Sequence, residues 1–451
     1  MQHTRYALSL FQRSSLSLLV GMALASTAQA QSLNEVYEMA KDYDAAYQAA
    51  KSQYQANLAK AEQGKAVLLP TAGLSSGVTR TMLDITGAGA AARGYTTQTA
   101  GINASQPLYR PANLATYRQS QKALDAAQAA LTQAEQELIV RTSQAYFDVL
   151  SAQDSLTFVK AQKTAVGEQL SSAKRNFEVG TATITDTREA QARFDLVTAQ
   201  EIAADNDLRV KKVALEILVG KSGINPLNLK TQSNLPPVPE GTLDTWVSTS
   251  EQNHPGIRQA RTNFEVAQLE TEKAQAGHKP TVDFTLGYNL QKNINGTATA
   301  NLSGTSNQVT LASAGIVANV PLFAGFATQN RIRETVALEE KARLDLEGVQ
   351  RQIAQATRTA YFGLQSGLGQ VKALEAAESS SQVALDANKL GYQVGVRINI
   401  DVLNSQSQLF QTKRDLAKAR YDVLVGQLRL RQASGTLKTE DLNLINDLLQ
   451  K

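Results

Sequence analysis

Apolar and polar residues alternate strictly along residues 282–291, which predicts a β-strand. One face of this strand is polar or glycine, and the apolar face carries Val282, Phe284, Leu286, Tyr288 and Leu290. Residues 71–83, 95–106 and 308–320 are rich in Thr, Ser, Gly and Val and give three further strand predictions. The segments 86–94 and 293–306 are expected to be the loops that join the four strands in two pairs.

Stretches without helix breakers predict helices of unusual length. Residues 112–179 contain no proline and one glycine, and residues 328–394 also lack proline. At 1.5 Å per residue, each helix would be roughly 100 Å long if continuous. Each stretch ends at a glycine turn, after which a second helix is predicted over 185–220 or over 399–435. A shorter helix is predicted over residues 33–66.

The first long helix carries only a narrow apolar stripe, formed by Leu124, Ala127, Leu131, Ala134, Leu138 and Ala145. Most remaining positions are Gln, Thr, Ser, Lys and Glu, so water is expected on more than one side of it. A hollow cylinder of helices, wet inside and outside, fits this pattern. An extended coiled coil fits it too, but leaves the four strands unexplained.

The second half of the chain repeats the first at an offset of about 210 to 215 residues. Pro70-Thr71 recurs as Pro280-Thr281, Tyr146-Phe147 as Tyr361-Phe362, and Val179-Gly180 as Val394-Gly395. We therefore expect two structural repeats, and each would contribute equivalent parts to a larger assembly. The expected boundaries are a first repeat at 31–234, a proline-rich linker at 235–242, a second repeat at 243–435 and a tail at 436–451.

Residues 1–30 have the features of a cleaved secretory signal. Arg5 and Arg13 form a basic start, residues 16–25 an apolar centre, and Ala28-Gln29-Ala30 a small-residue cleavage site. Without these two arginines, the basic residues nearly balance the 41 acidic ones, so charge gives no argument for a nucleic-acid partner. The chain has no cysteine, which excludes disulfides and thiolate metal sites.

The strand pattern allows two interpretations. Alternation suits a soluble antiparallel sandwich and also a sheet that faces lipid. The predicted strands are about 11 to 14 residues long, which matches the roughly 9–11 residues that cross a bilayer at a tilt. Four strands cannot close on themselves, and open sheet edges are not viable in lipid. A membrane sheet would therefore need several copies of the chain to pool their strands.

Short segments along the chain carry a family resemblance, namely the prolines that precede the strands and residues 145–150, 175–180, 184–186, 391–395, 400–403 and 419–421. With these segments, essentially the whole mature chain resembles the TolC family of outer-membrane efflux channels. The resemblance implies a mainly α protein with β-strands. Its internally duplicated protomer would contribute four strands to a trimeric 12-stranded outer-membrane β-barrel, and long helices to a periplasmic α-helical barrel.

The resemblance also implies a function and partners. The protein would be a passive exit channel, in the outer membrane of a Gram-negative bacterium, for tripartite efflux pumps or type I protein secretion. Its partners would be two further copies of the chain, outer-membrane lipid, a periplasmic adaptor (membrane fusion) protein and an inner-membrane pump of the RND, ABC or MFS type.

A gate at the periplasmic tip of the helical hairpins follows from the same resemblance. Carried over by position, Tyr392 and Arg397 of the second repeat would contact Thr185 and Asp186 of the first. Local roles are open as well. Asp186, followed three residues later by Glu189, has the pattern of a capping box, and Tyr392 could be a packing residue.

Two further gate positions differ from the family pattern. Asp401 would ring the entrance, but the second ring position, commonly aspartate in the family, is Asn404 here. Fewer fixed charges predict weaker cation selectivity, which Asn404→Asp should sharpen. Arg397 and Asp401 could also form only a local i,i+4 pair. Arg420 falls on another family contact position without a clear partner, because Arg175 occupies the matching place.

Catalytic, metal and cofactor sites are not expected. Only His254 and His278 remain after signal removal, and neither has a second ligand at metal spacing. The main alternative function is a soluble periplasmic coiled-coil adaptor or scaffold protein, which would have no use for four strands of membrane length.

Overall fold

The computed structural model describes residues 30–83, 93–230, 235–237, 241–295 and 307–450. The predicted signal segment up to residue 29, most of both strand-joining loops and part of the proline-rich linker lie outside the described residues. Within them the chain forms two compact units. The strand unit contains Lys51–Leu131 and Pro255–Arg351, and the hairpin unit contains the chain up to Ala50, Thr132–His254 and Gln352–Lys451. Each unit thus draws on both halves of the sequence.

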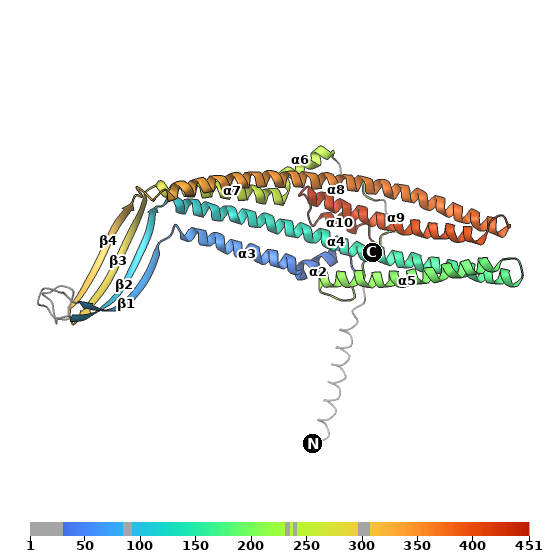
Figure 1. Cartoon of the computed structure of the whole chain (residues 1–451), viewed down its shortest axis with the longest axis horizontal. Helices are drawn as coiled ribbons and strands as arrows, with labels where there is room; N and C mark the ends of the chain where they lie inside the picture. Colours follow the sequence, from blue (N-terminus) through green and yellow to red (C-terminus); the bar gives the residue numbers. More distant parts are fainter. Residues whose placement is uncertain (1–29, 84–92, 231–234, 238–240, 296–306, 451) are drawn as a thin grey trace, which may run out of the picture. The chain divides into compact units, whose positions relative to one another are not determined.

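Four antiparallel strands form one sheet in the strand unit, in the order β1-β2-β3-β4 (Figure 1). Their bounds are β1 Thr71–Leu83, β2 Arg93–Tyr109, β3 Thr281–Ile294 and β4 Asn307–Asn319. All four predicted strands are confirmed, with β2 and β3 each a few residues longer than expected. A register shift between Pro107 and Tyr109 marks the end of β2, where proline cannot donate a ladder hydrogen bond.

The strand register places apolar residues of all four strands on one face of the sheet, whereas Val309, Leu311 and Val317 of β4 lie on the other face. Leu74 lies opposite Ile102, Ile102 opposite Tyr288, and Tyr288 opposite Ala312. Directly opposed residues point to the same side, so this row runs across all four strands. In a single chain this face is uncovered, since Leu74 is 80% exposed and Tyr288 51%. An exposed apolar surface that crosses all four strands is typical of a site that contacts a membrane or another protein rather than water.

Two helical hairpins dominate the hairpin unit. α5 runs back along α4, and α9 runs back along α8 (Figure 1). The bounds are α4 Pro111–Glu178, α5 Ile184–Val219, α8 Ala327–Gln393 and α9 Asn399–Ala433. α4 and α8 are continuous over 68 and 67 residues, as the absence of proline predicts. No helix in the described part of the chain combines the length and apolar character that a membrane span requires.

The remaining helices are shorter: α2 Leu33–Tyr43, α3 Ala45–Ala66, α6 Leu243–Asn253, α7 Pro255–Gln275, the 3₁₀ turn η1 Ala276–His278 and α10 Asp441–Asn446. The prediction of one helix over 33–66 is wrong, because the chain breaks at Asp44. The Asp44 side chain accepts a hydrogen bond from the Tyr47 backbone N–H at 2.8 Å and so begins a new helix.

The turns that close the two hairpins have the same geometry. Gly180 and Gly395 both adopt the left-handed conformation, with φ of 80° and 78°. The Gly180 N–H donates to the Phe177 carbonyl at 3.0 Å, and the Gly395 N–H donates to the Tyr392 carbonyl at 3.2 Å. A side chain at either position would be strained, which accounts for the glycine at matching places in the two repeats.

α4 and α9 pack around a buried aromatic group. Phe147 is 1% exposed, and its ring stacks on that of Tyr421 with the centroids 5.6 Å apart. The Tyr146 hydroxyl lies 3.1 Å from the carbonyl oxygens of Gln31 and Leu227, which ties two loop segments to α4. This core holds the first hairpin against α9.

Candidate functional site at the hairpin tips

Two apolar clusters hold the tip ends of the hairpins together. The first joins α4, α5 and α9 and consists of Val159, Val166, Leu170, Ala173, Ala190, Val197 and Leu403. The second joins α8 and α9 through Leu385, Val402 and Leu409, with Tyr392 packed against it. α9 therefore contacts both hairpins, and polar residues at its start lie where the hairpins meet.

Asp186 takes part in a capping box at the start of α5. It is the third residue after the N-cap, whereas its sequence pattern suggests that it is the N-cap itself. Thr183 is the N-cap residue, and its hydroxyl accepts from the Asp186 N–H at 3.2 Å. The Asp186 carboxylate accepts in turn from the Thr183 N–H at 3.0 Å and from its hydroxyl at 2.7 Å. The carboxylate is thus occupied locally, and Thr185 beside it is exposed.

In the described part of the chain, Tyr392 and Arg397 do not bond Thr185 or Asp186, and for Arg397 the local alternative that the sequence allows is the one that forms. The Tyr392 hydroxyl accepts a hydrogen bond from the Asn176 amide at 3.3 Å, which links α8 to α4. Arg397 forms an ion pair with Asp401 at 3.6 Å, the local i,i+4 arrangement. Across the described residues, neither side chain forms a hydrogen bond or ion pair with Thr185 or Asp186. Asp401, one helical turn away, is simply the nearest carboxylate that Arg397 can reach.

A buried amide makes the more direct link between the hairpins. Asn399, the first residue of α9, is fully buried. Its side-chain oxygen accepts from Gln169 of α4, and its amide nitrogen donates to the Asp186 carbonyl at 3.3 Å. No local sequence motif marks this residue, although one signal is present. At the 215-residue offset, Asn399 stands where the first repeat has the apolar, exposed Ile184.

Asn404 is bound by an arginine that no local sequence motif marks. Arg193 of α5 donates from Nη2 to the Asn404 side-chain oxygen at 2.7 Å. Asn404 itself is exposed on α9. This contact places a positive charge beside residue 404, which the resemblance predicted as the second ring position of the entrance.

Arg420 has a partner on its own hairpin. It pairs with Glu375 of α8 at 2.8 Å, and the two side chains are 40% and 49% exposed. The neighbouring Tyr421 connects the hairpins instead, because its hydroxyl donates to the Asp154 carboxylate of α4 at 2.7 Å. Burial raises the pKa of Asp154 above the ordinary value of an aspartate, and the hydrogen bond from Tyr421 offsets part of that rise.

The exposed positions of α9 are all polar, and they form a single stripe. Spaced three, four or seven residues apart, they are Asn404, Gln408, Gln411, Asp415, Lys418, Asp422 and Arg429. Three- and four-residue steps keep a stripe on one helix face. Asp401, half-buried, continues it toward the tip. Fifteen other α9 residues are buried, so this stripe is the face that α9 presents to water.

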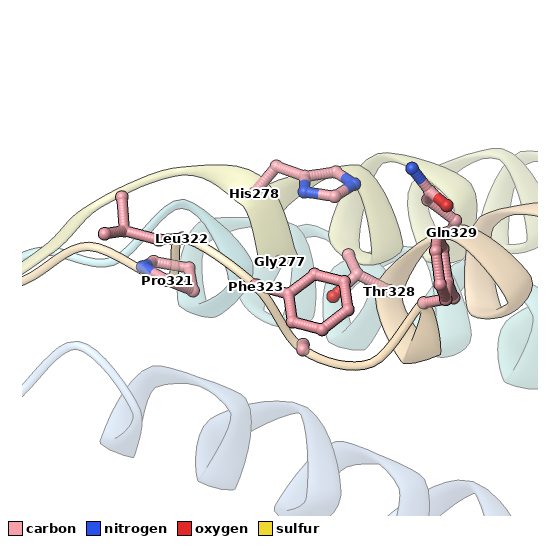
Figure 2. Close-up of a pocket in the computed structure, with 9 residues that line it drawn as sticks. Gly277, His278, Pro321, Leu322, Phe323, Thr328 and Gln329 are labelled. Atoms are coloured by element: carbon pink, nitrogen blue, oxygen red, sulfur yellow. The ribbon is translucent and has the colours of Figure 1, made fainter.

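A small cavity of about 110 Å³ lies in the strand unit, between the end of β4 and the start of α8. Figure 2 shows His278 and Thr328 beside the segment that carries Pro321, Leu322 and Phe323. Leu322 and Phe323 are mostly exposed. None of the predicted gate residues lines this cavity.

The duplicated hairpins, the sheet with one apolar face and the polar stripe of α9 together define an outer-membrane efflux channel subunit. The chain belongs to the outer membrane efflux protein family, whose sequence model matches residues 36–221 and 246–436, one match in each repeat. Family membership places the protein in the outer membrane of Gram-negative bacteria.

Individual relatives agree with this assignment. The chain is 32% identical to the outer membrane protein TolC of Vibrio cholerae, over 94% of this chain and 95% of that protein. It is 30% identical to the alkaline protease secretion protein AprF of Pseudomonas aeruginosa, over 94% and 88%. The crystal structure of the outer membrane protein VceC of Vibrio cholerae shares the fold, with a TM-score of 0.76 at 19% identity over 89% of this chain and 96% of that one.

Proposed function

We propose that three copies of this chain form a passive exit channel through the outer membrane, used in efflux and in type I protein secretion. Relatives named for efflux and for protease secretion support both uses. The observation that carries the proposal is the uninterrupted polar stripe of α9. A helix with one polar face in water and its other faces buried or partly buried against neighbouring helices is what a water-filled conduit needs in its wall.

The exposed surface of α5, unlike that of α9, includes large apolar side chains. Ile202, Val210, Val213 and Ile217 are all more than half exposed in one chain. Apolar side chains at such spacing form a seam for another helix. α5 therefore supports contact with a further copy, whereas α9 supports contact with water.

The internal repeat indicates which surfaces meet. Within one chain, Phe147 of α4 is buried beside α9, where Val425 and Leu428 are 2% and 1% exposed. Their counterparts at the 215-residue offset are Phe362 of α8, and Val210 and Val213 of α5. Phe362 is 54% exposed, Val210 56% and Val213 52%.

The contact that α4 makes with α9 inside the chain is thus available a second time, between α8 of one copy and α5 of the next. Each copy offers one α8 face and one α5 face, so the contact can be repeated head to tail, and it forms a ring when the rotation between neighbouring copies closes. The two edge strands offer a similar pair of surfaces. β4 of one copy can pair with β1 of the next, so that three copies would bring twelve strands into one closed sheet with its apolar face toward lipid.

The gate in this proposal lies at the hairpin tips and includes Thr185, Asp186, Tyr392, Arg397, Asp401 and Asn404. The contacts that support closure are the links from Asn399 to Gln169 and Asp186, from Asn176 to Tyr392, and from Arg193 to Asn404. The Arg397–Asp401 pair is exposed and lies within one helix, so it would contribute little. Closure therefore rests mainly on amide hydrogen bonds that a docking partner could displace.

The partners in this proposal are a periplasmic adaptor and an inner-membrane pump of the RND, ABC or MFS type, which would supply the energy for export. Family membership supports this assignment.

Purification in detergent followed by planar-bilayer recording tests the proposed function. We expect a particle with the mass of three chains and discrete conductance steps. A monomer that is stable in buffer without detergent and gives no conductance would refute the proposal, and would favour a soluble periplasmic adaptor or scaffold.

A further inference from the structure

Arg193 is the cation closest to the first exposed position of the α9 stripe. Its guanidinium donates to the Asn404 side chain at 2.7 Å, and Asn404 faces water. Because an amide carries no net charge, this hydrogen bond holds the guanidinium in place without neutralising it. Asn404 thus acts as a neutral support for an arginine at the wet face of the helix.

The other charges near this level have separate partners or positions. Asp401 pairs with Arg397 at 3.6 Å, and the Asp186 carboxylate is engaged by Thr183. Glu189 lies one helical turn from Arg193 on α5, toward the tip. Among the residues that the structure describes, no carboxylate lies within ion-pair distance of Arg193.

We propose that Arg193 is a selectivity-determining residue, which makes the level of residue 404 in the channel tip electropositive and so opposes the passage of cations. This inference rests on the proposed function, since it needs three copies around one conduit. Threefold repetition brings three guanidinium groups to one level of a narrow passage. Rings of charged side chains are a principal source of ion preference in pores.

The proposal changes what is expected of Asn404→Asp. A new carboxylate at this position would lie within ion-pair distance of Arg193, so the two charges would largely offset each other. Asn404→Asp alone should then cause only a moderate shift toward cations. A marked cation preference requires that the arginine charge be removed as well.

Reversal potentials in a potassium chloride gradient across a planar bilayer provide the test. Arg193→Gln and Asn404→Asp should each shift the potential toward that of potassium by a similar, moderate amount. The double variant should shift it further than either single variant, because only the double variant leaves a net negative charge at this level. Arg193→Lys keeps the charge and should stay near the parent. Arg209→Gln is the matched control, because Arg209 lies on the same helix, pairs with Asp205 and should leave selectivity unchanged.

Three results would overturn the inference. In the first, Arg193→Gln keeps the parent potential and the double variant equals Asn404→Asp. In the second, Arg193→Lys shifts the potential as far as Arg193→Gln, which would indicate a structural role. In the third, Arg209→Gln shifts it as far as Arg193→Gln. A parent protein that forms trimers but never conducts would refute the proposed function and this inference together, whereas conductance without these shifts refutes the inference alone.

Discussion

Asn399→Ala should loosen the join between the two hairpins and raise the resting conductance of the channel. Asn399 is fully buried, and its side chain bonds Gln169 of one helix and the Asp186 carbonyl of another. Alanine removes both hydrogen bonds without adding bulk.

The expected size of the effect follows from what is left unpaired. A buried polar group that loses its partner costs about 1–3 kcal/mol. Gln169 and Asp186 are half-buried, so water can partly replace the lost bonds. We therefore expect the closed arrangement to lose about 1 kcal/mol per chain, the low end of that range, which corresponds to roughly a fivefold rise in the open population for each chain.

Single-channel recording and leak of a large antibiotic into cells measure this rise. Asn388→Ala is the control, because Asn388 of α8 donates to Ser405 of α9 and so bonds within one hairpin. The control should conduct like the parent. The reasoning is refuted if Asn399→Ala forms trimers whose conductance and leak equal the parent's, or if Asn388→Ala opens the channel equally.

Three further predictions concern other contacts. Tyr392→Phe removes the hydrogen bond from Asn176 and should raise the resting conductance slightly. Arg397→Ser should raise it less, because the ion pair of Arg397 lies within one helix. A larger rise for Arg397→Ser than for Tyr392→Phe in bilayer recordings would contradict this assignment. Phe362→Asp should prevent trimer assembly, since it places a charge on the face of α8 that is expected to meet α5 of the next copy. The control Leu444→Asp, at an exposed position of α10, should still form trimers. Light scattering in detergent measures the particle mass, and trimers of Phe362→Asp would contradict the proposed contact between α8 and α5. Because burial raises the pKa of Asp154, its contribution to stability is present below the ordinary carboxyl pKa and is lost as pH rises through the raised value. Asp154→Asn should therefore increase the thermal midpoint of unfolding more at pH 7 than at pH 4. An equal change at both pH values would show that ionisation of Asp154 does not affect stability.

The elements of the fold could be predicted from sequence because each depends on a local pattern. Alternation located β3, and a composition rich in Thr, Ser, Gly and Val located the other three strands. The lack of proline located α4 and α8 to within about a residue at each end. The break at Asp44 was missed because residues 33–66 are good helix formers on both sides of it. One side-chain cap at Asp44, which also pairs with Arg141 at 2.6 Å, decides the local structure there.

The tip contacts were harder to predict because they depend on tertiary pairing. Position alone suggested that Arg397 would cross between hairpins, but Asp401 is available one turn away. Arg193 and Asn399 carry no local motif and become visible only when α5 and α9 are side by side. Comparison of the two repeats could have singled out Asn399, since an amide replaces Ile184 there.

The most direct test of the central claim is chemical modification of the α9 stripe. The chain has no cysteine, so each introduced thiol is the only one in its chain. In a conducting bilayer, a charged thiol reagent should lower the conductance of Gln408→Cys and Gln411→Cys in steps, one for each copy. It should leave Ile202→Cys of α5 unaffected, because that side chain is expected to be covered by a neighbouring copy. Unchanged conductance at both stripe positions, or an equal fall at Ile202→Cys, would contradict the assignment of α9 as the wall of the conduit.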